Sequence, residues 1–296
     1  EEAAEGLKTL IETAKNKVCG DDQGALDSFK VYLVAHSMGG LIARCFLQSI
    51  ATPTERDIVE KVFTYATPHN GIEMLGFNVP SFLGVNDLNN FNRARMAHFL
   101  DLPTNSRRVD TLDGKYDPKK FFCLVGTNPK DYSAARGLSR KGAGALSDGL
   151  VRIQNATVQN APRAFVHRSH SGPYGIVNSE EGYQNLVRFL FGDVKVKATM
   201  HVEDLPLPPE IQESLDDGQD VKASYYFEST ISPRGAISYN LSERTTATES
   251  AVFRTFDELL RNETPRSPVL FSTFLDTKKI LSGRSLVFSI QLAVKT

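Results

Sequence analysis

The segment from Val31 to Gly40 constrains the fold of this chain more than any other. An apolar run, Val31-Tyr32-Leu33-Val34, leads into Ala35-His36-Ser37-Met38-Gly39, and an apolar segment follows from Leu41. This order predicts a buried strand, a tight turn and a largely buried helix. Such a turn closes only if the residues two before and two after its centre are nearly free of side chain, and Ala35 and Gly39 meet that condition.

The turn would expose the hydroxyl of Ser37, which makes Ser37 a candidate nucleophile. A Ser hydroxyl is a weak nucleophile unless a base lies beside it on an accessible turn. The usual pattern is G-x-S-x-G, and Ala35 departs from it by one methyl group. A structural Ser in a tight turn is the alternative interpretation. If Ser37 is the nucleophile, the backbone N–H of Met38 is the first expected oxyanion donor.

A second apolar run, Val62-Phe63-Thr64-Tyr65, ends in Ala66-Thr67-Pro68-His69-Asn70-Gly71. This ending resembles the T-P-H-x-G loop of the lipase and esterase branch of the α/β-hydrolases, in particular bacterial lipases related to triacylglycerol lipases. The resemblance implies a doubly wound, mostly parallel sheet. It also implies a triad in the chain order Ser, acid, His. His69 comes too early in that order to be the base, and we expect it to bond to loop backbone.

Asp148 is the candidate acid. It follows a third apolar strand, Phe121–Gly126, and its surroundings, Ser147-Asp148-Gly149-Leu150-Val151, resemble the D-G-hydrophobic-V signature of lipases. The alternative is an ordinary Asp-Gly turn.

The candidate base is His170, which follows a fourth strand beginning at Ala164. Ser171 and Gly172 come directly after it and indicate a loop. His167, which we expect within the strand, remains the alternative base.

An insertion, residues 72–119, separates the second and third strands. Its first part is rich in apolar side chains, and Gly76, Pro80 and Gly84 break it into short pieces. The resemblance implies a lid over the substrate; a packed cap without motion is the alternative. Its later part, which includes Asp110, has the charges of a solvated surface. On the basis of the resemblance, the expected substrate-binding side chains are His36, Thr67, Phe77, Phe82 and Leu83.

Only one helical pattern, with an apolar face from Leu7 to Val18, precedes the strand at Val31. In the full hydrolase fold the nucleophile turn follows the fifth strand, and an earlier loop supplies the second oxyanion donor. Without those strands a Val-rich central strand would become an open edge, which native sheets avoid. We therefore expect an upstream polypeptide or a second chain to complete the sheet and the oxyanion hole.

The sequence pattern changes after Gly192. Val194, Val196 and Ala198 alternate with polar residues, as in a strand with one buried face. Further strand candidates span residues 221–231, 236–242, 269–275 and 286–294, and 249–260 could be helix or strand. The chain is thus expected to have an α/β-hydrolase domain, 1–192, followed by an all-β, sandwich-like domain, 193–296. The second domain could bind lipid, a partner or the rest of the chain, or be purely structural.

Composition excludes several classes of function. The net charge is −1 over 296 residues, which gives no bias toward nucleic acid. No segment approaches the ~18 apolar residues of a membrane span. We find no metal-ligand pattern and no phosphate loop, so no cofactor is expected. The three cysteines cannot all pair, and nothing here indicates a compartment.

The resemblance implies a serine hydrolase that cleaves carboxylic esters, lipid esters among them, through an acyl group carried on Ser37. A thioesterase, peptidase or acyltransferase would use the same three residues. A non-catalytic binding protein could also keep this scaffold, because a fold does not by itself fix an activity.

Overall fold

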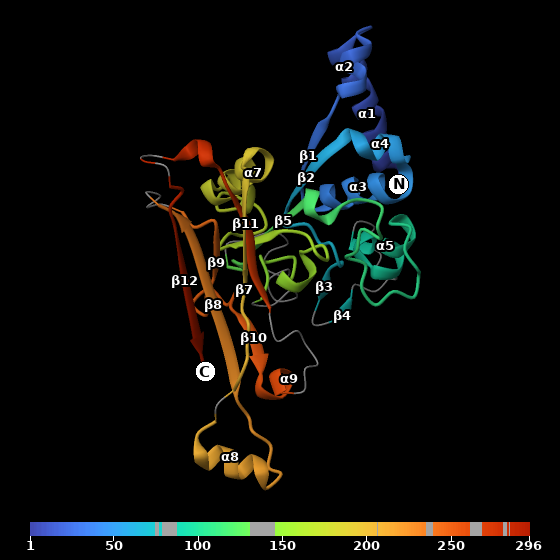
Figure 1. The fold of residues 1–296 in the computed structure, drawn as a ribbon. Helices are drawn as coiled ribbons and strands as arrows, with labels where there is room; N and C mark the ends of the chain where they lie inside the picture. Colours follow the sequence, from blue (N-terminus) through green and yellow to red (C-terminus); the bar gives the residue numbers. More distant parts are fainter. Residues whose placement is uncertain are drawn as a thin grey trace.

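The computed structural model describes residues 1–74, 77–78, 88–130, 146–205, 207–234, 239–260, 268–280, 283 and 285–296. We call the residues up to Phe191 the α/β part and those from Val194 the C-terminal β part (Figure 1). Within the described ranges, no helix combines the length and the hydrophobicity needed to span a membrane.

The α/β part is built on a four-stranded parallel sheet in the order β1-β2-β5-β6. These strands are β1 (Val31–His36), β2 (Val59–Tyr65), β5 (Phe121–Gly126) and β6 (Arg163–Val166). Because all four run in the same direction, the loops after them meet at one edge of the sheet. Those are the loops that carry the candidate site residues.

Apolar side chains leave this sheet on both faces, as in a doubly wound fold. Val62 and Phe121 join a core with the helices of one face, whereas Phe63 and Phe122 join a second core under α7. Successive strand residues point to opposite faces, so each apolar run supplies both cores. The helices are α1 (Glu2–Cys19), α2 (Gln23–Ser28), α3 (Met38–Cys45) with the π-helical turn η1 (Phe46–Ile50), α4 (Pro53–Ile58), α5 (Arg93–Phe99) and α7 (Glu180–Phe191).

Helix α1 is the helix predicted ahead of the first strand. It contacts α3 and η1, with Ala4, Leu7 and Ile11 in the core of that face. Leu10 and Val18 are exposed, so the expected apolar face is only partly buried.

The described part of the insertion packs as a cap. Met96, Leu100, Val109 and Leu112 are buried in the same core as α3. The prediction of a solvated surface is wrong at Asp110, which is 3% exposed and forms an ion pair with Arg108. Short elements of this region are β3 (Glu73–Met74), β4 (Phe77–Asn78), η2 (Leu88–Phe91) and η3 (Pro118–Lys120).

The C-terminal β part contains antiparallel sheets. In one, β8 (Ser224–Pro233) pairs with β9 (Ser242–Arg244), β10 (Val252–Thr255) and β12 (Phe288–Lys295); in the other, β7 (Val194–Thr199) pairs with β11 (Val269–Leu275). Their apolar faces share one core that includes Phe227, Ile231 and Phe271. The ambiguous segment 249–260 forms both β10 and a helix, α9 (Phe256–Leu260), and α8 (Pro209–Asp216) follows β7.

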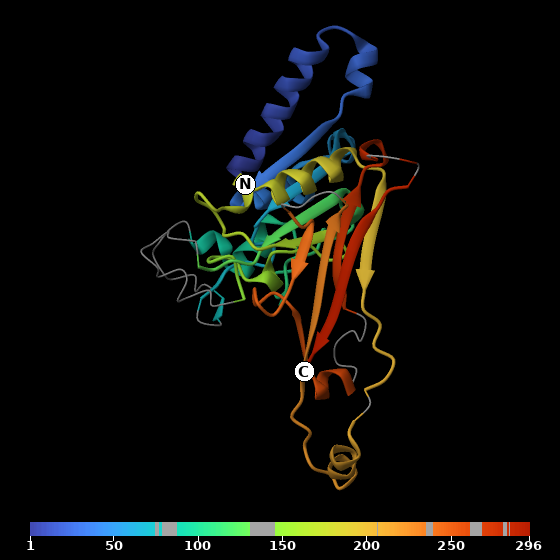
Figure 2. The same cartoon turned by 90° about the vertical axis from the view of Figure 1, so that its left-hand side faces the viewer.

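The C-terminal β part lies directly against the parallel sheet. Strands β9 and β11 contact β6, and β11 also contacts α7. The side view in Figure 2 shows these strands beside α7 and the sheet. The division of the chain at residue 192 stays a prediction.

Candidate active site

Ser37 occupies a strained turn between β1 and α3. Its backbone has φ 53° and ψ −125°, a conformation that non-glycine residues rarely adopt. The Ser37 N–H donates to the carbonyl of Tyr65 at 2.9 Å, which ties the turn to the end of β2. A Cβ placed on Gly39 would lie 3.4 Å from the Cβ of Ala35, so the two small residues of the motif are in contact. The turn thus has the conformation that the sequence predicts.

Three side chains from different loops form one hydrogen-bonded line. The Nε2 of His170 lies 2.9 Å from the Oγ of Ser37, and its Nδ1 lies 2.9 Å from Oδ2 of Asp148. Asp148 follows β5 and His170 follows β6, so the loops at the carboxyl ends of the strands bring them together. His170 and Asp148 are 3% and 1% exposed. In this geometry an imidazole could take a proton from the hydroxyl while the carboxylate orients the ring.

The carboxylate of Asp148 is held by its own loop. Its Oδ1 accepts hydrogen bonds from the backbone N–H of Leu150 at 3.0 Å and of Val151 at 2.7 Å. The Asp148 carbonyl in turn accepts from the backbone N–H of His170 at 2.9 Å. Gly126 makes the close approach possible, because a Cβ there would lie 2.8 Å from the Cβ of Asp148. The loop therefore leaves Oδ2 directed at the imidazole.

His36 and His167, two further histidines considered above, lie differently. His167 follows the last residue of β6 and is exposed, so the expectation that it lies within the strand is wrong. The Nε2 of His36 lies 2.8 Å from the carbonyl of His170, and the two rings are 4.9 Å apart. Burial lowers the pKa of His36, and the positive charge that His170 can carry lowers it further. A neutral His36 can donate to that carbonyl and so hold the loop of His170 in place.

The loop after β2 is buried against the helix that follows Ser37. Thr67 is 1% exposed, and a Cβ on Gly40 would lie only 2.3 Å from its Oγ1. His69 is buried and its Nε2 lies 3.1 Å from Oγ1 of Thr64, so it bonds to a side chain and not, as expected, to loop backbone. Burial, and then the charge of Arg44, holds the pKa of His69 well below its usual value. His69 is therefore neutral and lies outside the Ser37–His170–Asp148 line.

Arg44, which the sequence reading missed, connects these parts. It is fully buried on α3. Its guanidinium donates to the carbonyls of His69 at 2.8 Å and of Val109 and Thr111 at 2.7 Å. Burial lowers its pKa to about 10, so it stays charged at neutral pH. The signal was present in the sequence, because an Arg surrounded by apolar residues on a helix predicts a buried cation with specific partners.

The structure describes only some of the remaining expected site residues. Phe82 and Leu83 lie outside the described residues, and of Phe77 only its backbone place in β4 is described. Met38 occupies the first position of α3, where a backbone N–H has no intrahelical acceptor. Among the described residues, no group of three or more His, Cys, Asp or Glu side chains could hold a metal ion.

Similarity to known proteins is found at the level of sequence and of structure. Residues 4–105 match the family model of the PGAP1-like alpha/beta domain. Over 162 residues the chain is 28% identical to triacylglycerol lipase 2 of Saccharomyces cerevisiae. The aligned region covers 53% of this chain and 48% of that protein. The chain thus spans about half the length of that relative.

Two crystal structures of the Bacillus licheniformis lipase BlEst2 also resemble this chain. The alignment with the mature form has 19% sequence identity and a TM-score of 0.43, and it covers 64% of this chain and 71% of that chain. The alignment with the propeptide form has 12% sequence identity and a TM-score of 0.44, and it covers 99% of this chain and 61% of that chain.

The family model, that of an alpha/beta domain, agrees with the parallel sheet and the helices of the α/β part. The chain thus has an α/β-hydrolase-like fold, with a four-stranded parallel sheet among the described residues, and it is similar in sequence to a lipase.

Proposed function

We propose that this chain carries the catalytic residues of a serine hydrolase that cleaves carboxylic esters, lipid esters among them. The observation that carries the proposal is the line of two 2.9 Å contacts from Ser37 through His170 to Asp148. The strained backbone of Ser37 supports it, because strain of this kind persists mainly where surrounding structure maintains it for function.

In the acylation step the Oγ of Ser37 attacks the ester carbonyl carbon while Nε2 of His170 takes its proton. Asp148 accepts the hydrogen bond from Nδ1 and stabilises the imidazolium without being protonated itself. The tetrahedral intermediate then collapses, and His170 returns the proton to the leaving alcohol. Water, activated by His170, releases the acyl group from Ser37 as a carboxylic acid and restores the hydroxyl.

The negative charge of the intermediate needs fixed donors, and loss of one commonly costs about 10²–10³ in rate. We propose the backbone N–H of Met38 as the first donor. The second would come from an upstream polypeptide or a second chain that pairs with β1. In support, β1 ends the order of the described parallel sheet, and the apolar side chains of Tyr32 and Val34 are 44% and 49% exposed.

Lipid esters are the preferred substrate class within this proposal. The name of the yeast relative, a triacylglycerol lipase, supports that choice. The insertion would act as a lid over the substrate. Thioesters and acyl transfer use the same chemistry, and the test below includes them.

The test uses the chain with any preceding segment that the native polypeptide has. A fluorophosphonate should label Ser37, and Ser37→Ala should abolish labelling without changing the circular dichroism spectrum. Asp148→Asn should lower kcat by about 10⁴-fold with little change in KM, because it leaves the wrong imidazole tautomer in place. His167→Ala, an exposed histidine three residues from His170, is the matched control and should leave kcat unchanged.

A series of p-nitrophenyl esters from short to long acyl chains, with matched thioesters, then assigns the substrate class. Turnover that rises with acyl length supports a lipase, and faster turnover of thioesters would move the assignment to a thioesterase. A folded protein that does not react with the fluorophosphonate would contradict catalysis and favour a binding scaffold.

A further inference from the structure

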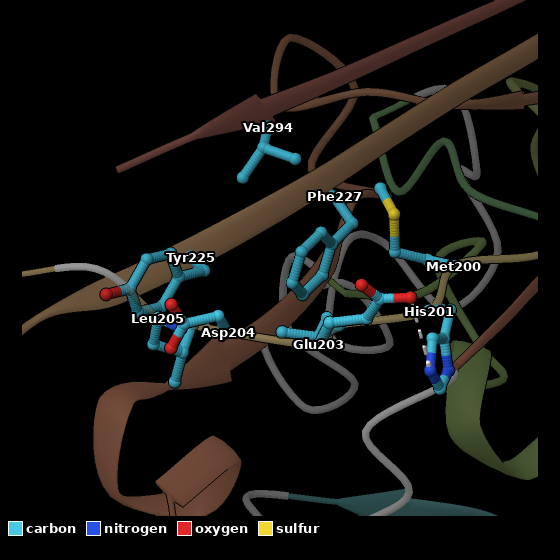
Figure 3. A pocket seen from close by; sticks show the side chains of 9 residues that line it. Met200, His201, Glu203, Asp204, Leu205, Tyr225, Phe227 and Val294 are labelled. Atoms are coloured by element: carbon cyan, nitrogen blue, oxygen red, sulfur yellow. Dashed lines mark hydrogen bonds and ion pairs between the residues drawn. The ribbon is translucent and has the colours of Figure 1, made fainter.

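A pocket of about 460 Å³ opens in the C-terminal β part (Figure 3). It shares no residue with the Ser37–His170–Asp148 line. Its volume falls in the range of about 300–1,000 Å³ that is typical of sites for small molecules. Six apolar or aromatic side chains line it together with three polar ones. The first group is Met200, Val202, Leu205, Tyr225, Phe227 and Val294, and the second is His201, Glu203 and Asp204.

The apolar floor arises where the two sheets separate. Strand β7 ends at Thr199, and the following residues continue its alternation, so that Met200 and Val202 pack against the core. Opposite them, Phe227 on β8 is 3% exposed. Val294 on β12 pairs directly with Phe227 and therefore points to the same face of the sheet. The pocket lies between this face and the segment that follows β7.

An exposed row of apolar side chains leads away from the pocket along β12. Alternate residues of a strand share a face, so Phe288, Ile290 and Leu292 lie on the same side as Val294. We call these four residues the β12 row. Their exposed fractions are 37%, 40%, 56% and 52% from Phe288 to Val294, although two of the paired residues of β8, Ile231 and Phe227, are part of a core. At a strand rise of roughly 3.3 Å per residue, the row is about 20 Å long.

Two of the three polar side chains at the pocket are acidic. Figure 3 shows the carboxylate of Glu203 between the ring of Phe227 and His201, whose Nε2 lies 4.0 Å from it. In the same view Asp204 lies next to Leu205 and Tyr225, and its Oδ1 accepts from the backbone N–H of Leu205 at 2.9 Å. No lysine or arginine is among the described lining residues. Two carboxylates next to an apolar floor favour a ligand that joins a cation to a hydrocarbon chain and disfavour an anionic one.

We propose that this pocket binds a single-chain amphiphile with a cationic head group. The head group lies at Glu203 and Asp204, and the chain lies on the apolar floor and continues along the β12 row. A free fatty acid, the product expected of the α/β part, is disfavoured by its charge. The site is thus a separate binding site, and it stands whether or not Ser37 is catalytic.

Methionine signals allow the pocket and the candidate active site to be observed in one titration. The chain has four methionines, of which Met200 lines the pocket, Met38 follows Ser37, and Met96 is fully buried elsewhere. The protein is labelled with ¹³C-methyl methionine, and Met→Leu variants assign the signals. Dodecyltrimethylammonium, kept below its micelle concentration, should shift the Met200 signal in a saturable manner and leave Met96 unchanged.

Charge selectivity is tested with an anionic ligand of the same chain length and with variants of the two acidic residues at the pocket. Dodecanoate should not shift Met200 at concentrations that saturate it with the cation. Glu203→Gln and Asp204→Asn should each weaken binding of the cation about two- to fivefold, as expected for exposed charges. Glu12→Gln, an exposed residue of α1, removes the same charge away from the pocket and should have no effect.

Occupancy of the pocket is tested by filling it. Val294→Trp places a ring in the pocket from an exposed edge position and should abolish the Met200 response. Ala293→Trp places the same ring on the opposite face of β12 and should preserve it. A cation that shifts only Met38, equal binding of dodecanoate, or undiminished binding to folded Val294→Trp would each overturn the proposal.

Discussion

At the scale of single residues, Gly40 is a position where the packing leaves no room for a side chain. An added Cβ would lie 2.3 Å from Oγ1 and 2.7 Å from Cγ2 of Thr67, both in a buried side chain. Gly39, its neighbour on the same helix, would place a Cβ at 3.4 Å from Ala35, which is an ordinary contact. A methyl group can therefore be added at Gly39 but not at Gly40 without a steric clash.

We expect Gly40→Ala to destabilise the protein by about 1–3 kcal/mol, the usual cost of overpacking a buried contact. It should also slow the reaction of Ser37 with a fluorophosphonate, because α3 and the loop of Thr67 would move apart. Gly39→Ala is the matched control, since the same methyl group there meets no clash. Urea unfolding and labelling rates measure both effects. Equal stability of the two variants would contradict the argument.

The sequence predicted the three residues that α/β-hydrolases place in a fixed order along the chain. It missed residues whose hydrogen-bond partners lie far away in the sequence. The structure brings Ser37, Asp148 and His170 together, and their catalytic role stays a prediction. The contact of His36 with the carbonyl of His170 joins residues 134 positions apart, which no local pattern indicates. The contacts of Arg44 with the cap depend in the same way on tertiary packing.

At the scale of secondary-structure elements, Glu73 connects the start of the insertion to two other segments. It is 8% exposed and pairs with Arg93 at the start of α5. It also lies 3.3 Å from Nη1 of Arg152 and 3.3 Å from Nε2 of Gln154, just beyond the loop of Asp148. Burial by itself would raise the pKa of Glu73, but the hydrogen bond and charge of Arg93 bring it below the usual value.

A lowered pKa means that the folded state holds the ionised form of Glu73 more strongly than the unfolded state does. Its contribution to stability is present above the unfolded pKa of about 4.3 and is lost as pH falls through the lower folded value. We expect Glu73→Gln to cost about 1–3 kcal/mol near neutral pH. Urea unfolding between about pH 7 and pH 3 should show a shallower loss of stability in this variant than in the parent.

The control for this experiment is Glu60→Gln. Glu60 has a half-exposed side chain and lies 3.9 Å from Lys120, a pair that should contribute little. The same pH dependence in Glu73→Gln as in the parent would show that Glu73 does not contribute in this way.

Elements were predictable from the sequence where one pattern dominated a segment. Every strand of the parallel sheet coincides with an apolar run. The cap was harder, because Asp110 has the composition of a surface residue and is buried through its pairing with Arg108. The segment 249–260 was ambiguous because a strand and a helix follow each other within it.

At the scale of the whole molecule, the C-terminal β part covers the β6 edge of the parallel sheet. The Oγ of Ser242 accepts from the backbone N–H of Phe165 at 3.1 Å. Phe274 on β11 packs against Phe122 and Phe189, at ring distances of 6.1 Å and 5.2 Å. A covered edge cannot pair with other chains. The sequence indicated a change of pattern at residue 192 but not this interface, because its contacts join segments far apart in the chain.

Asn185 on α7 is another buried polar link between the two parts. Its Nδ2 donates to the carbonyl of Leu241 at 2.8 Å, and its Oδ1 accepts from the Oγ1 of Thr273 at 3.2 Å. Both partners belong to the C-terminal β part, and Asn185 is 1% exposed. Removal of the Asn185 amide therefore leaves the Leu241 carbonyl and the Thr273 hydroxyl without this partner.

If the two parts unfold as one cooperative unit, Asn185→Ala should lower the stability of both by the same amount, about 1–3 kcal/mol for buried groups left unsatisfied. Hydrogen exchange followed by mass spectrometry measures this separately for β2 and β5 and for β8 and β11. Asn16→Ala, an exposed position on α1, should leave protection unchanged in all four strands. Loss of protection confined to β8 and β11 would instead mean that the C-terminal β part unfolds independently. The interface would then be a docking contact between two domains, which is the organisation that the sequence alone suggested.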